Sequence, residues 1–157
     1  MAKKKAAVPT EKQFSIQKLY VKDISFESPS VPGIFTEKWT PKVDINLTTK
    51  SNKGQDDGPD DLYEVSVTVT ATVKTNDKTA YLVEATQVGA FSVANFPEKE
   101  MRPLLGSYCP NILFPYLREA ISGLVTKGGF PPLLLNPVNF DAFYAQHLQK
   151  ADKTKLN

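Results

Sequence analysis

Residues 63–74 read Tyr-Glu-Val-Ser-Val-Thr-Val-Thr-Ala-Thr-Val-Lys, and this stretch decides the fold of the 157-residue chain. Its odd positions are apolar from Tyr63 to Val73, while its even positions carry charged or hydroxyl-bearing side chains. Successive side chains of a strand point to opposite faces, so one face suits a core and the other suits water. One wet face is typical of antiparallel sheets, because parallel sheets are usually covered on both sides. The sequence therefore predicts a half-buried antiparallel strand here.

The chain then turns back on itself. Residues 76–78 read Asn-Asp-Lys, a composition typical of tight hairpin turns, since Asn and Asp tolerate left-handed backbone angles. Residues 79–93 alternate again, which predicts the returning strand of a hairpin. One face of that strand holds Tyr81, Val83, Ala85, Phe91 and Val93, and the other holds Leu82, Glu84, Thr86 and Val88.

Two more strands are predicted before the hairpin. Residues 14–27 have a period of two, but Lys18 and Lys22 interrupt the apolar face, and Leu19 and Val21 interrupt the polar face. The second strand alternates Val43, Ile45 and Leu47 with polar residues. Residues 28–41 carry three prolines and predict an irregular crossover, although Val31, Ile34, Phe35 and Trp39 make it unusually apolar. Residues 50–61 predict a solvated loop.

After residue 94 the period changes to that of helices. A short helix is predicted from Glu98, and a longer one over 111–127 with Pro110 in its first turn and a kink at Pro115. Gly128 and Gly129 end it. Asn139 suits the N-cap of a last helix reaching about Lys150. We therefore predict an α+β fold: a four-stranded antiparallel sheet with a long kinked helix and a C-terminal helix on one side.

The net charge of +2 hides an uneven distribution. Residues 1–12 carry +3 and residues 145–157 carry +2, which leaves the body 13–144 at −3. We expect residues 1–12 and 151–157 to be disordered tails, with one folded domain at 13–150. Because the positive charge lies in the tails rather than on a folded face, no nucleic-acid partner is predicted.

Several classes of protein are disfavoured by composition. One cysteine, Cys109, and one histidine, His147, form neither an internal disulfide nor a Cys/His metal cluster. The sequence has no glycine-rich phosphate loop or nucleophile elbow, so we expect no catalytic residue, cofactor or metal. The longest apolar runs fall far short of the roughly 20 residues that a membrane span needs. No apolar signal-peptide segment follows Lys3–Lys5. These features favour a cytoplasmic protein that does not insert into membranes.

Three segments resemble the SecB family of bacterial protein-export chaperones. They are Asp23-Ile-Ser-Phe-Glu27, Tyr108-Cys-Pro-Asn-Ile-Leu-Phe-Pro-Tyr116 and Pro137-Val-Asn-Phe-Asp-Ala142, and they stand in the family's order. The resemblance covers about residues 14–149. It implies an ATP-independent, cytosolic holdase that keeps exported precursors unfolded and delivers them to the SecA ATPase. It also implies a homotetramer built as a dimer of dimers.

The resemblance also implies two protein-binding surfaces. The SecA-docking positions are Asp23, Glu27, Leu82 and Glu84. The groove for unfolded precursors matches Val43, Ile45, Leu47, Tyr81, Tyr144 and Leu148. From pattern and position we add Ile34, Phe35 and Trp39 of the crossover and Phe140 and Phe143 of the last helix.

Each of these residues also has an ordinary interpretation. The crossover aromatics could form core under a long loop, the helical stripe could pack on the sheet, and the carboxylates could belong to a solvated face. An enzyme pairing Cys109 or a serine with His147 is disfavoured. A nucleic-acid or membrane-surface binder using the basic tails is a further alternative, as is a SecB-like chaperone serving a toxin–antitoxin system. The basic tails depart from the family, whose members often have acidic or Gln-rich tails.

Overall fold

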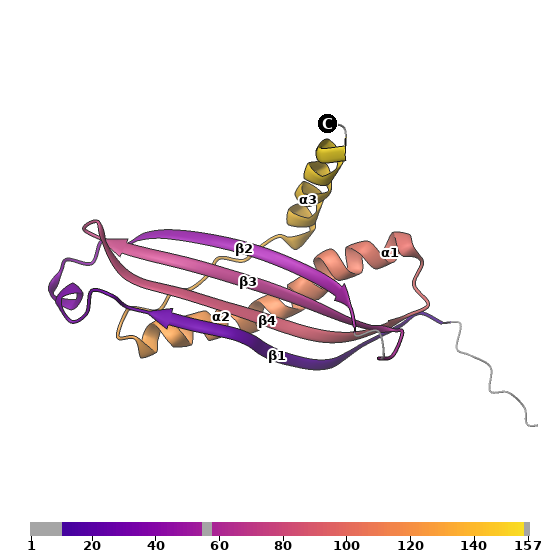
Figure 1. Ribbon diagram of the computed structural model, residues 1–157, viewed down its shortest axis with the longest axis horizontal. Helices are drawn as coiled ribbons and strands as arrows, with labels where there is room; N and C mark the ends of the chain where they lie inside the picture. Colours follow the sequence, from indigo (N-terminus) through magenta and orange to yellow (C-terminus); the bar gives the residue numbers. More distant parts are fainter. Residues whose placement is uncertain (1–10, 55–57, 156–157) are drawn as a thin grey trace, which may run out of the picture.

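The computed structural model describes residues 11–54 and 58–155. Four antiparallel strands form one sheet in the order β1-β4-β3-β2, with the helices on one side (Figure 1). The strands are β1 (Gln13–Glu27), β2 (Lys42–Lys53), β3 (Leu62–Thr75) and β4 (Lys78–Ala94). The helical elements are η1 (Gly33–Thr36), α1 (Glu98–Pro103), η2 (Leu104–Tyr108), α2 (Cys109–Lys127) and α3 (Phe140–Lys155). The predicted fold class is confirmed.

The predicted hairpin joins β3 to β4. Asn76 and Asp77 have φ angles of 50° and 62°, so both central turn residues adopt the left-handed region. That geometry matches the twist of the flanking strands, and Asn and Asp accept it at low cost because their short side chains bond locally. Thr75 pairs with Lys78 directly across the turn. A one-residue bulge at Ala80 then shifts the pairing, so the turn and this bulge together set the register of the two central strands.

The alternation of β3 produces one buried and one open face of the sheet. Val65, Val67, Val69, Ala71 and Val73 are at most 1% exposed. They face α2, which buries a stripe at four-residue spacing made of Cys109, Leu113, Leu117, Ile121 and Val125. We call this side the inner face. The opposite side, with the hydroxyl-bearing residues of β3, faces solvent and is called the open face.

The mixed faces of β1 are explained by two β-bulges. Its pairing with β4 shifts between Ile16 and Lys18 and again between Val21 and Asp23. Each bulge inserts one extra residue, so the strict period of two is lost and the side chains change faces. Leu19 therefore lies opposite Gly89 on the inner face. The expectation that Leu19 and Val21 lie on the polar face is therefore wrong, because both lie on the inner face.

The helices differ from the prediction in two ways. α1, η2 and α2 follow one another without a break from Glu98 to Lys127, and the irregular turn is the π-helical segment η2. Pro110 lies at the start of α2, directly after the π-helical segment, and the helix continues through it. α3 runs to Lys155, so the disorder predicted from residue 151 is wrong for 151–155. No Gly or Pro ends the helix there, and Lys153 and Lys155 suit the negative end of its dipole. Residues 1–10, 156 and 157 of the predicted tails lie outside the described residues.

A single helix cannot cover this sheet. Four strands span about 19 Å, whereas a helix with its side chains is about 10–12 Å wide. α2 packs mainly on the central strands β4 and β3. Apolar inner-face residues on both outer strands consequently stay about 45% exposed: Ile16, Val21 and Ile24 on β1, and Val43 and Ile45 on β2. These two apolar flanks position the surfaces described next.

Candidate functional site

An aromatic cluster lies where the crossover loop passes the end of α2. Phe130 is its centre, with ring centroids 5.0 Å from Tyr81, 5.1 Å from Phe35, 5.8 Å from Trp39 and 6.4 Å from Phe26. Phe130 and Tyr81 are buried, whereas Phe35 is 51% exposed. Offset aromatic pairs each add about 0.5–1.5 kcal/mol beyond the buried area. The loop therefore rests on a buried aromatic floor and keeps one ring open to solvent.

The crossover loop is held against the β3–β4 turn. The buried hydroxyl of Thr75 donates to the Lys38 carbonyl at 2.9 Å and accepts from the Thr40 N–H at 3.0 Å. The Glu37 carboxylate accepts hydrogen bonds from Lys78 Nζ at 2.6 Å and Asn76 Nδ2 at 2.8 Å. These bonds, first that from Lys78, lower the pKa of Glu37. They fix the loop that carries Phe35 and Trp39.

An apolar groove continues from this cluster along β2. Val43 lies opposite Val73, which in turn lies opposite Tyr81, so the β2 flank begins beside the cluster. Further along, a pocket of about 200 Å³ opens between β2 and the extended segment that follows α2. Its lining is Ile45, Leu47, Val69, Phe114, Leu135, Asn136, Pro137 and Val138. We call this surface, from Phe35 and Trp39 through Val43, Ile45 and Leu47 to Val138, the β2 groove.

The structure divides the residues predicted for the precursor groove into three groups. The β2 groove brings together Phe35, Trp39, Val43, Ile45 and Leu47. Ile34, Tyr81 and Phe140 are at most 3% exposed and belong to the core, because η1, β4 and α3 each turn them inward. Tyr144 and Leu148 line a different hollow of about 520 Å³ between α1 and α3. Phe143 belongs to none of the three groups: it is partly buried, packs against the core, and its ring lies 6.2 Å from that of Phe140.

Tyr144 is held away from β2 by a close contact with η2. A Cβ added to Gly106 would lie 2.4 Å from the Tyr144 ring, so only glycine permits this packing. Asn139 caps the same end of α3: its Oδ1 accepts from the Ala142 N–H at 3.1 Å, as predicted for an N-cap. Asp141 also accepts a hydrogen bond from the buried Ser107. α3 is thus anchored by its first turn, and the rest of it stands away from the sheet (Figure 1).

The sequence interpretation missed one wall of the β2 groove. That wall includes Phe130, Leu135 and Val138, for which no role was predicted, and Phe114, which was predicted only as part of the long helix. The signal for them was the run Phe-Pro-Pro-Leu-Leu-Leu that follows Gly128 and Gly129. An apolar run that proline keeps extended must pack on another element. Here it packs alongside α2 and faces β2.

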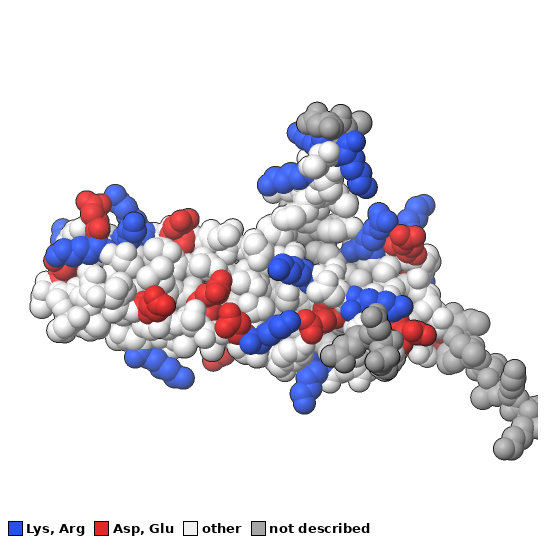
Figure 2. All heavy atoms as spheres, viewed as in Figure 1, with Lys and Arg blue, Asp and Glu red and all other residues white. Residues whose placement is uncertain are grey.

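The four residues predicted for SecA docking all lie on the open face. Asp23 pairs with Thr86, Ser25 with Glu84, and Glu27 with Leu82 on the neighbouring strands β1 and β4. Glu84 Oε1 accepts a hydrogen bond from the Thr70 hydroxyl at 2.8 Å. The sequence interpretation missed Asp44, which lies on the same face opposite Thr72, the neighbour of Leu82. We call Asp23, Glu27, Asp44 and Glu84 the acidic row. Figure 2 looks onto this face and shows acidic side chains spread across the sheet.

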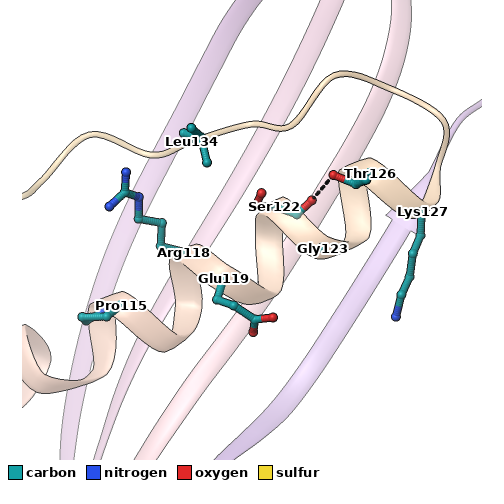
Figure 3. A pocket seen from close by; sticks show the side chains of 8 residues that line it. All are labelled: Pro115, Arg118, Glu119, Ser122, Gly123, Thr126, Lys127 and Leu134. Atoms are coloured by element: carbon teal, nitrogen blue, oxygen red, sulfur yellow. Dashed lines mark hydrogen bonds between the residues drawn. The ribbon is translucent and has the colours of Figure 1, made fainter.

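The outer side of α2 carries a third surface. A hollow of about 630 Å³ lies between α2 and the extended segment after it (Figure 3). It is lined by Pro115, Arg118, Glu119, Ser122, Gly123, Thr126, Lys127 and Leu134. Leu134 is 63% exposed, and a Cβ on Gly123 would meet nothing within 4 Å. This side of the helix is therefore open and mixed in character, with the charged Arg118, Glu119 and Lys127 beside small residues and Leu134.

The described residues hold no cluster of metal ligands, and their cysteine is buried. Among residues 11–54 and 58–155, no three His, Cys, Asp or Glu side chains come close enough to hold a metal ion. Cys109 is fully buried, and burial raises the pKa of its thiol to about 12. The thiolate needed for nucleophilic attack is thus disfavoured. No helix in the described ranges is both long and apolar enough to cross a membrane.

A family model for the preprotein translocase subunit SecB matches residues 7–151 of this sequence. The chain belongs to the SecB family. The protein-export protein SecB of Methylococcus capsulatus is 62% identical over 143 residues, which are 91% of this chain and 90% of that protein. The SecB protein of Hydrogenovibrio crunogenus is 53% identical over 146 residues, covering 92% of this chain and 95% of its own length.

A solved structure shows the same SecB-type architecture. The SecB-like chaperone of Mycobacterium tuberculosis, solved with a ChAD peptide from the HigA1 antitoxin, superposes with a TM-score of 0.64. The match covers 80% of this chain and 90% of that chain at 13% identity, so it concerns the fold alone. With the sequence relatives, family membership identifies a Sec-pathway export chaperone and not an enzyme.

Proposed function

We propose that this SecB-family chain holds unfolded precursor proteins in the β2 groove and delivers them to SecA through the acidic row. It works without ATP, in the cytoplasm, as a homotetramer whose folded domain begins near residue 13 and includes α3 to Lys155. The observation that carries the proposal is the placement of the two surfaces on opposite faces of one sheet. A bound precursor on the inner face leaves the open face free for SecA.

The β2 groove suits an unfolded client because it offers exposed apolar surface and does not require a particular client sequence. Val43 and Ile45 are 46% and 45% exposed, and Phe35 leaves one ring open. Burying apolar surface contributes roughly 25 cal/mol per Å² and is non-directional. A long client that crosses several such weak sites gains affinity by multivalency. A client held in this way is kept from folding, because binding favours its unfolded state.

The acidic row suits a basic partner. Two of its carboxylates adjoin Leu82, because Glu27 lies directly opposite and Glu84 is the next same-face residue on β4; Leu82 is only partly buried on an otherwise hydroxyl-rich face. Complementary charge raises the rate of encounter and selects the partner, while an apolar centre supplies contact area. SecA docking at this face is the role that the SecB resemblance implies for Asp23, Glu27, Leu82 and Glu84.

A dimer of dimers needs two different self-complementary surfaces. The first candidate is the edge strand β1, whose outer backbone groups are free for pairing and whose Ile16, Val21 and Ile24 are exposed. The second is the outer side of α2 around Gly123 and Leu134, where a second helix could approach closely. Each of these surfaces is distinct from the β2 groove and from the acidic row.

The toxin–antitoxin alternative is not favoured. The relatives at 62% and 53% identity are export proteins, whereas the antitoxin-bound chaperone of M. tuberculosis shares the fold at 13% identity. At that level of identity the client preference of one chain says nothing about the other.

A refolding assay tests the holdase function. Excess protein should slow the refolding of a denatured export precursor in the absence of ATP, and the mature, fast-folding form should be less affected. Light scattering in the same buffer should give the mass of a tetramer. Refolding at the uninhibited rate with excess tetramer would show that the holdase proposal is wrong.

A further inference from the structure

Two lysines face each other at one end of the open face. Lys42 on β2 and Lys74 on β3 are direct cross-strand partners, and both side chains are exposed. Among the described residues, neither lysine has an acidic group within 4.0 Å; the four ion pairs present involve other cations. The pair thus presents two positive charges side by side, neither of which forms an ion pair within the described residues.

This arrangement has a cost that the fold does not explain. Like charges directly opposite each other in an antiparallel pair destabilise the sheet. Lysines on an edge strand often prevent association of sheets, which would account for Lys42. Lys74, however, lies on β3, which has neighbours on both sides. Edge protection therefore does not account for the pair.

The lysine pair adjoins the acidic row. Asp44, Thr72 and Leu82 are the next same-face residues on β2, β3 and β4, about 7 Å further along the strands. Along the open face the charge thus changes from positive at Lys42 and Lys74 to negative at Asp44, Glu27, Glu84 and Asp23. Figure 2 shows blue and red side chains together at the crossover end of the sheet, and several red side chains with a few blue ones over its middle.

We propose that Lys42 and Lys74 bind an acidic side chain of the same protein whose basic residues meet the acidic row. The inference rests on the proposed docking function and adds the chemistry of the partner: a polypeptide surface with a basic centre and a carboxylate toward the crossover end. The two charge signs fix the orientation of the partner, since a reversed partner would place like charges together.

The test uses Lys42→Glu in the full-length chain, titrated with the SecA of the same genome by calorimetry at low and physiological salt. The substitution converts a repulsive cross-strand pair into an attractive one, so the melting temperature should rise by about 1–3 °C. SecA binding should nevertheless weaken about 3- to 10-fold, as loss and reversal of one exposed ion pair predicts. A purely structural role would not move stability and binding in opposite directions.

Lys50→Glu is the matched control. Lys50 lies on the same strand and the same face, opposite Ser66 and about 26 Å from Lys42, and it undergoes the same charge change. If Lys42→Glu and Lys50→Glu weaken SecA binding equally, the effect comes from net charge alone and the proposal is wrong. Unchanged SecA binding by Lys42→Glu would also overturn it. Glu84→Lys, measured alongside, distinguishes a failure of the lysine inference from a failure of the proposed docking face. If it weakens binding while Lys42→Glu does not, only the lysine inference fails; if neither weakens binding, the docking face itself is wrong.

Discussion

The Tyr20 hydroxyl donates a 2.8 Å hydrogen bond to Glu64 Oε2 across an intervening strand. Tyr20 is on β1 and Glu64 on β3, and β4 runs between them. The side chain of Tyr20 therefore reaches over the open face at Val88, its direct partner on β4. Val88 is fully buried although it lies on the solvent side of the sheet. This contact ties an outer strand to an inner one by a route other than the backbone ladder.

Replacing Tyr20 with Phe should measure how much the Tyr20–Glu64 hydrogen bond contributes to stability. The variant keeps the ring over Val88 and removes only the hydroxyl, so the cost should be about 1 kcal/mol of unfolding free energy. Urea denaturation gives that value, and NMR should show the pKa of Glu64 moving up toward its ordinary range. Thr68→Val, which removes a hydroxyl pair with Thr86 on the same face, is a control that should leave the Glu64 pKa unchanged.

The same pair predicts a pH dependence. The hydrogen bond from Tyr20 lowers the pKa of Glu64. The ionised carboxylate therefore stabilises the fold above the unfolded-state pKa near 4.3, and this stabilisation is lost as pH falls through the lower folded-state pKa. Burial, followed by the bond to Glu64, raises the pKa of Tyr20 to about 12. The protonated Tyr20 hydroxyl therefore stabilises the fold below the unfolded-state pKa near 10, and this stabilisation is lost as pH rises toward the folded-state pKa of about 12.

The stability difference between the wild type and the Tyr20→Phe, Glu64→Gln double variant should therefore be flat between about pH 5 and 9 and smaller at both extremes. Denaturant titrations across that range measure it. A difference that grows in acid would contradict the assignment of the low carboxyl pKa to this pair.

Ile45→Asp should separate client binding from assembly. Ile45 is 45% exposed in the β2 groove, so the charge is tolerated by the fold but removes apolar area and repels apolar segments. We expect client affinity to fall about 10-fold, by fluorescence anisotropy with a labelled unfolded precursor, with the tetramer mass and SecA binding retained. Ile24→Asp is the matched change on the β1 flank, and there the mass by light scattering should fall instead.

Glu84→Lys should weaken SecA docking about 10-fold and leave client affinity within 2-fold, because the acidic row and the β2 groove lie on opposite faces. The substitution also removes the bond from Thr70, so Glu84→Gln is needed beside it. Gln still accepts that bond, and its effect on docking reports the charge alone. Equal loss of client and SecA binding in an intact tetramer would contradict the separation of surfaces.

Gly123→Leu should break the assembly without harming the protomer. Nothing lies within 4 Å of a Cβ at this position, and leucine favours the helix by roughly 0.5–1 kcal/mol over glycine. The side chain would fill the hollow on the outer side of α2 and keep a second copy away. We expect a smaller mass by light scattering with an unchanged circular dichroism spectrum. An intact tetramer would place the subunit contact elsewhere.

Prediction from sequence succeeded where the signal was local. The alternation of 63–74, the Asn-Asp turn and the Asn139 cap depend on residues close in the chain, and all three are confirmed. It failed for the faces of β1, where the extra residues Gln17 and Lys22 form bulges, each of which moves the side chains after it to the other face. A bulge of this kind has no characteristic residue type that would reveal it in the sequence. The end of α3 was also missed, since a polar helix of alanine and lysine resembles a tail.

The candidate surfaces followed the same division. That Asp23, Glu27 and Glu84 share a face could be proposed from parity and resemblance, but Asp44 joined them only through the β2–β3 register. Periodicity marked Tyr144 and Leu148 as an apolar stripe, yet it carried no information about which element they meet. Phe130 had no periodic signal at all, although it is the centre of the aromatic cluster.

The sequence by itself determined the sheet, its wet and dry faces and the family, because side-chain alternation and family motifs are properties of neighbouring residues. Only the tertiary structure decided which apolar residues are core and which are surface. The physical reason is width: one helix covers the two central strands, so apolar inner-face residues of β1 and β2 remain half exposed while those of β3 and β4 are buried. No local pattern records how far a distant helix reaches across a sheet.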